Sequence, residues 1–81
     1  MNPTPRQCIR ILDAYDAGIA TIFEIGGNRC VLSRKKKGGR LEVGSVSLEL
    51  REAVGTKNGG IRFNCEDGTV VLVSPSKEAK Q

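Results

Sequence analysis

Six basic side chains lie within one window of this chain, and no acidic residue interrupts them. They are Arg29, Arg34, Lys35, Lys36, Lys37 and Arg40. The 81-residue chain carries a formal net charge of only +4, so the residues outside this window are acidic on balance. Clustered lysines and arginines can neutralise the phosphates of a nucleic-acid backbone and release its counterions.

The flexibility of this basic window predicts contacts with phosphates rather than with base edges. Gly38-Gly39 predicts a flexible loop, which can follow a backbone or enter a groove without a fixed base code. We therefore expect the six basic residues to bind DNA or RNA with weak sequence preference. The simpler interpretation of the same window is a solvated loop tip that keeps the protein soluble.

A second functional class also fits this sequence: a small protein-interaction module or inhibitor, of the accessory type found on phages and mobile elements. The basic loop would then bind an acidic surface of a protein partner, or a free sheet edge would pair with a partner's strand. Because 81 residues build only a small core, a homodimer formed by sheet extension is a natural supplement to stability.

The residue types that catalysis and metal binding require are scarce. The chain has no histidine, and it has no GxSxG, phosphate-loop or HExxH pattern. A structural zinc site needs about four ligands at short spacings, whereas Cys8, Cys30 and Cys65 are widely separated. We expect no enzyme, cofactor or metal site, and three cysteines that serve as small buried hydrophobes.

The targeting signals that a sequence can carry are also missing. No long apolar run and no signal-peptide pattern occurs, so neither membrane insertion nor secretion is expected. Three cysteines without a pairing pattern suit a compartment that keeps thiols reduced, and we expect a cytoplasmic protein.

Two hairpins are predicted to frame the rest of the fold. Asp67-Gly68 lies between two β-rich runs in residues 62–73, which is typical of a type I′ turn with a two-residue loop. The resulting register predicts four side chains on the core-facing side. They are Phe63, Cys65, Val70 and Leu72.

The same pattern occurs forty residues earlier, in residues 22–33. A two-residue loop at Gly27-Asn28 again predicts one apolar, core-facing side. Its members are Phe23, Ile25, Cys30 and Leu32.

One helix is predicted before the first hairpin. Thr4-Pro5 is a typical N-terminal cap, and Gly18 is a typical end signal, so the helix is expected over residues 5–17. Cys8, Leu12 and Tyr15 share its apolar face.

Residues 45–54 fit two structures. Val46, Leu48 and Leu50 alternate as in a strand, whereas Val46, Leu50, Ala53 and Val54 fit a helical stripe among strong helix formers. The helix is favoured, because a helix followed by a hairpin would then occur twice.

These elements predict a single α+β domain over residues 1–81, with flexible ends at 1–3 and 75–81. Its expected order is helix-hairpin-helix-hairpin (αββαββ) with an antiparallel sheet, either as an internal duplication or as two unrelated hairpins. The alternative, if residues 46–51 form a strand, is a small mostly-β barrel with one N-terminal helix.

Overall fold

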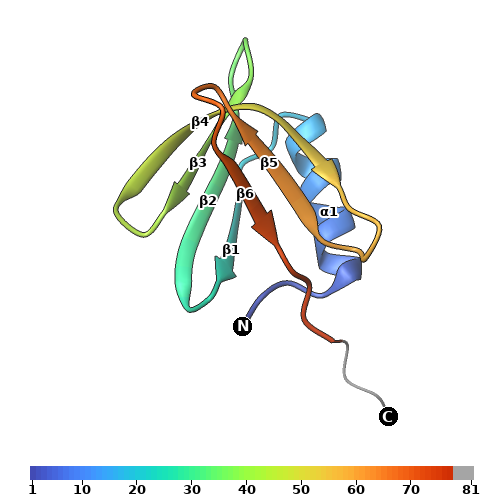
Figure 1. Cartoon of the computed structure of the whole chain (residues 1–81). Coiled ribbons are helices and arrows are strands. Elements are labelled where there is room, and N and C mark those ends of the chain that lie inside the picture. Colours follow the sequence, from blue (N-terminus) through green and yellow to red (C-terminus); the bar gives the residue numbers. More distant parts are fainter. Residues whose placement is uncertain (78–81) are drawn as a thin grey trace.

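The computed structural model describes residues 1–77, which form one helix and a single six-stranded sheet (Figure 1). The elements are α1 (Pro5–Asp16), β1 (Thr21–Ile25), β2 (Asn28–Arg34), β3 (Gly39–Val43), β4 (Val46–Gly55), β5 (Ile61–Cys65) and β6 (Val70–Val73). All neighbouring strands are antiparallel, and their order in the sheet follows the chain from β1 to β6. Strands β1 and β6 are therefore the two edges.

Helix α1 begins as predicted. The N–H of Gln7 donates to the Thr4 hydroxyl, and the Thr4 N–H donates back to the Gln7 side chain, which forms a capping box. Pro5 occupies the first turn, where a missing N–H costs no hydrogen bond. Cys8, Ile11 and Tyr15 are buried, and α1 packs through this face on β1, β2 and β4.

The prediction of a second helix is wrong, because residues 46–55 form the long strand β4. The predicted αββαββ order and the predicted duplication of a helix-hairpin unit are therefore also wrong. The structure fits the mostly-β alternative with one N-terminal helix. A β-bulge explains the error. The register shifts between Leu50 and Glu52. Strict alternation would turn residue 52 to the same face as Leu50, but the next half-buried residue is Ala53. This spacing of three imitates a helical turn.

Strand β4 joins the two halves of the sheet. Its residues 46–50 pair with β3, and its residues 50–55 pair with β5. The bulge between these parts bends the strand, and Figure 1 shows β4 arching over the molecule. The sheet thus wraps around a core that it shares with α1. Its buried members from the sheet are Cys30, Leu32, Leu41, Leu50, Ile61, Phe63, Cys65 and Val73.

The predicted register of the second hairpin is wrong by one residue. Phe63 pairs with Val71, because the loop holds three residues and the Cys65 N–H donates to the Thr69 carbonyl at 2.8 Å. A shift of one residue exchanges the two faces of a strand. Val71 and Val73 therefore face the core. Val70 and Leu72 are 43% and 65% exposed.

The first hairpin keeps its predicted faces although its loop lies elsewhere. The turn is Gly26-Gly27, both with positive φ as a type I′ turn requires, so Phe23 pairs with Cys30 rather than with Leu32. A shift of two residues in the pairing leaves each side chain on the same face. Cys30 and Leu32 are buried, and Phe23 and Ile25 are half-buried.

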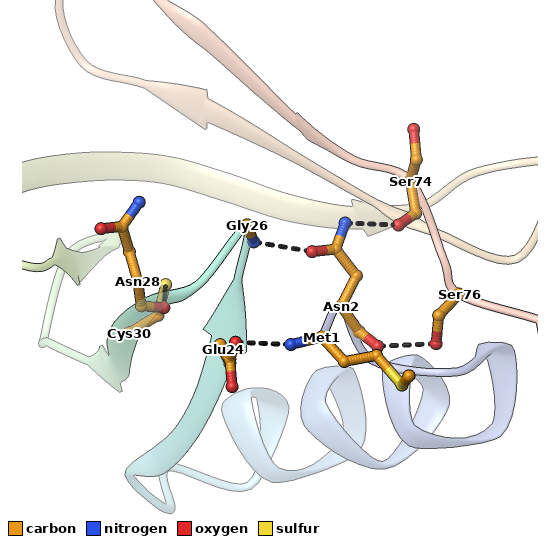
Figure 2. A network of polar contacts seen from close by, with 8 residues as sticks. All are labelled: Met1, Asn2, Glu24, Gly26, Asn28, Cys30, Ser74 and Ser76. Carbon is orange, nitrogen blue, oxygen red and sulfur yellow. Dashed lines mark hydrogen bonds and ion pairs between the residues drawn. The ribbon is translucent and has the colours of Figure 1, made fainter.

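The segment before α1 connects the two edges of the sheet (Figure 2). The Asn2 side chain accepts a hydrogen bond from the Gly26 N–H at 2.7 Å and donates one to the Ser74 carbonyl at 2.8 Å. Ser76 adds two bonds, from its N–H to the Pro3 carbonyl and from its hydroxyl to the Asn2 carbonyl. Part of the predicted flexible tail, residues 78–81, lies outside the described residues.

Candidate nucleic-acid interface

The basic window forms the connection between β2 and β3, which projects beyond the sheet at one end of the molecule (Figure 1). Arg34 ends β2, Lys35–Gly38 make the loop, and Arg40 lies in β3. The Lys35 N–H donates to the Gly38 carbonyl at 3.0 Å, which closes the loop tightly. Five of the six predicted basic residues are thus brought together.

Arg29 does not belong to this group. It lies near the opposite end of β2, where it pairs in register with Glu24 of β1. At about 3.3 Å per residue, its Cα is roughly 16 Å from that of Arg34. Arg29 therefore cannot contact the same phosphates as the tip of the loop.

The two glycines of the loop permit close packing at its base. A Cβ on Gly38 would lie 2.1 Å from the Leu50 carbonyl oxygen, and Gly38 has a φ of +70°. A Cβ on Gly39 would lie 2.4 Å from the Tyr15 hydroxyl and 2.7 Å from the Ser33 carbonyl oxygen. The base of the loop is therefore packed against β4 and α1.

Two carboxylates pair with three of the five cations. Glu49 of β4 lies 2.5 Å from the Lys35 ammonium and 3.1 Å from Arg40 Nε. These two hydrogen bonds hold the pKa of Glu49 below its ordinary value. Arg34 lies 3.6 Å from Asp16. All these pairs are exposed, so each contributes little free energy and weakens with salt.

Arg34 has a further contact that fixes its position. Its guanidinium carbon lies 5.3 Å from the centre of the Tyr15 ring, a cation–π distance. Burial raises the pKa of Tyr15, and the charge of Arg34 opposes that shift. The phenol therefore stays neutral beneath the guanidinium at physiological pH.

Lys36 and Lys37 occupy the tip of the loop. Both side chains are exposed, and neither forms an ion pair within residues 1–77. They are the cations of this end that are most available to a phosphate.

Arg51 is a sixth basic residue at this end, and the sequence interpretation missed it. It lines a cavity of about 210 Å³ together with Arg34 and Gly38 of the loop. Its guanidinium contacts the Glu66 carbonyl oxygen at 3.5 Å. The bulge of β4 places Arg51 there, and a helix over 45–54 would not have indicated this position.

The three cysteines lie in the core. Cys8, Cys30 and Cys65 are buried and unpaired, and burial raises the pKa of each thiol. Within the described part of the chain, no three histidine, cysteine or acidic side chains are grouped as metal ligands. No helix of residues 1–77 is long and apolar enough to cross a membrane.

No family model matches this chain, and neither a curated protein nor a solved structure matches it.

Proposed function

We propose that this protein is a non-catalytic nucleic-acid-binding protein whose β2–β3 loop contacts the phosphate backbone. The observation that carries the proposal is the position of Lys36 and Lys37. Both lie exposed at the tip of a projecting loop, and neither has a carboxylate partner within residues 1–77. Phosphates can reach these two ammonium groups without breaking an existing ion pair.

Arg34, Lys35 and Arg40 form the second set of phosphate contacts. Their present partners are the exposed carboxylates Asp16 and Glu49, and exposed ion pairs of this kind are weak. A phosphate that docks on the tip can therefore compete for them. Such contacts fix a protein on the backbone but read no base, so sequence preference should be weak.

An acidic protein surface presents the same charge as a phosphate backbone, and it is the rival partner for this loop. Glu49 pairs with two cations of the loop, and the Glu66 carboxylate lies beside Gly38. The positive surface is therefore small, which limits the affinity for either kind of partner. The projecting tip favours a groove, because a narrow loop can enter one. Direct binding of purified protein to nucleic acid distinguishes the two partners.

The test is a fluorescence-anisotropy titration of the protein against generic single- and double-stranded DNA and RNA at about 50 and 150 mM salt. The test variant is Lys36→Ala with Lys37→Ala. The matched control is Arg29→Ala with Lys57→Ala, which removes the same charge elsewhere. Lys57 belongs to the β4–β5 loop, which packs through Gly59 on Pro5 at the far end of α1.

We expect the tip variant to bind more weakly and to lower the slope of log affinity against log salt by about 2, one unit for each lost phosphate contact. The control variant should keep most of the slope. An absence of binding at the lower salt would overturn the proposal. Equal losses in both variants would show that net charge, not the loop, determines binding.

A further inference from the structure

A groove separates α1 from the edge strand β1, and none of its lining residues belongs to the basic loop. It encloses about 520 Å³, a volume in the range of ligand sites. Ile11 and Ala14 of α1 form one wall, and Ile22 and Phe23 of β1 form the other. Arg10 and Glu24 are among its polar lining residues, and Met1 also lines it.

The β1 edge of this groove offers unpartnered backbone groups. The turn Gly26-Gly27 makes Ile25 and Asn28 a hydrogen-bonded pair, and bonding to β2 alternates from there. The N–H and C=O groups of Ile22 and Glu24 therefore point to the open edge. The backbone N–H of Gly26, two residues further along, points to the same open edge, where it donates to the Asn2 side chain.

We propose that this groove binds an extended peptide segment of a protein partner, which adds to β1 as an antiparallel strand. The segment would exchange four hydrogen bonds with Ile22 and Glu24, the backbone groups that β2 leaves free. Backbone pairing of this kind supplies affinity, and alternate side-chain positions supply specificity.

The side chains around the edge define the chemistry of the segment. A residue opposite Phe23 would point to the same face as Phe23, into the groove beside Ile11, so it should be large and apolar. The residue opposite Glu24 should be basic, and the one opposite Ile22, which is 59% exposed, should be β-branched and apolar. The expected order is basic, large apolar, β-branched.

The edge strands of a second copy of this chain do not fit this order. β1 has the sequence Thr-Ile-Phe-Glu-Ile and β6 has the sequence Val-Val-Leu-Val, and neither offers a cation to Glu24. In the structure the Met1 ammonium group lies 2.5 Å from the Glu24 carboxylate. A basic residue of the peptide would therefore exchange one cation for another at this carboxylate.

The test is an NMR titration of the ¹⁵N-labelled protein with the capped peptide Ser-Thr-Lys-Leu-Val-Thr-Ser. We expect chemical-shift changes over residues 21–24 and slower hydrogen exchange of the Ile22 and Glu24 amides. Methylation of the peptide nitrogens of Lys and Val should weaken binding at least about tenfold, since both face β1. Methylation at Leu should leave the affinity within about threefold, since this nitrogen points away.

Two protein variants and one control localise the site. Ile22→Pro removes an outward N–H at an edge, where proline is tolerated, and Ala14→Met narrows the groove from the helix. Leu72→Pro makes the matched change at the β6 edge, because the Cys65–Thr69 bond directs the Leu72 N–H away from β5. The first two should lose binding and the third should retain it.

No shift over residues 21–24 at about 1 mM peptide would overturn the proposal, and so would binding that is indifferent to the methylated position. Neither result depends on the basic loop. The nucleic-acid proposal therefore stands or fails separately.

Discussion

Gly39 lies beneath the ring of Tyr15, at a distance that leaves no room for a side chain. An alanine Cβ there would lie 2.4 Å from the Tyr15 hydroxyl and 2.6 Å from a ring carbon. The ring belongs to the shared core and the other close neighbour is backbone, so neither can move cheaply. We expect Gly39→Ala to lower the free energy of unfolding by about 2–3 kcal/mol, measured by urea denaturation.

Gly55→Ala is the matched control for this change. Gly55 also lies in a strand against α1, but its Cβ would lie 3.5 Å from Leu12, an ordinary contact. An alanine there should change the stability by less than about 1 kcal/mol, because it adds packing and restricts the unfolded chain. Similar losses in both variants would show that the Tyr15 contact is not the cause.

At this scale the sequence identified most of the basic residues of the candidate interface. It also included one residue that lies elsewhere and omitted one that joins the loop in the structure. Arg29 is close to the loop in sequence, so the sequence alone groups it with the loop residues. This grouping does not consider the conformation of the chain between Arg29 and the loop. In the structure that chain is extended β2, which carries Arg29 to the far end. Arg51, distant in sequence, joins the loop only through strand pairing.

At the scale of elements, β4 shows why periodicity alone was insufficient. The predicted helical stripe used Leu50 and Ala53, whose spacing arises from the bulge. A bulge places two residues of one strand opposite one of the next, so it breaks alternation where the strand bends. Alternation before the bulge, at Leu48 and Leu50, was the correct signal.

The turn of the second hairpin shows a different limit. Asp67-Gly68 fits a two-residue loop, and it fits equally a three-residue loop with Gly68 in the left-handed region. The structure has the second, and the Asp67 carboxylate accepts the Thr69 N–H at 2.9 Å. Strand β6 is Val-Val-Leu-Val and has apolar side chains on both faces, so it tolerates either register and the choice depends on the turn.

Glu49 links the basic loop to the sheet, and it also limits the charge of the loop. It pairs with both Lys35 and Arg40. Glu49→Gln should free these cations, tighten nucleic-acid binding at low salt, and raise the salt slope by about 1–2. The measurement is the same anisotropy titration as for the tip variant.

Glu42→Gln is the control for Glu49→Gln. It makes the same charge change on β3, where Glu42 is exposed and forms no ion pair within residues 1–77. If both variants gained affinity equally, the effect would come from net charge. If Glu49→Gln gained none, Lys35 and Arg40 would not be phosphate contacts.

At the scale of the whole molecule, helix and sheet depend on one core. Cys8, Ile11 and Tyr15 of α1 belong to the same buried cluster as the strands. A chain of this size has only about 4–12 kcal/mol of stability in total, so any contact that joins distant parts is a large fraction of it. The N-terminal helix and the apolar face of the first hairpin were predictable. The face that β6 turns to the core was not, and neither was the link between the two sheet edges, which depends on one short polar side chain.

Asn2 provides that closure. It bridges Gly26 after β1 and Ser74 after β6, residues far apart in sequence (Figure 2). Asn2→Ala should therefore lower the free energy of unfolding by about 1–2 kcal/mol and speed hydrogen exchange of the Gly26 amide. Asn28→Ala is the matched control, since Asn28 is exposed and its side chain makes no hydrogen bond within the described residues. Unchanged exchange at Gly26 in Asn2→Ala would show that the sheet edges hold together without this bridge.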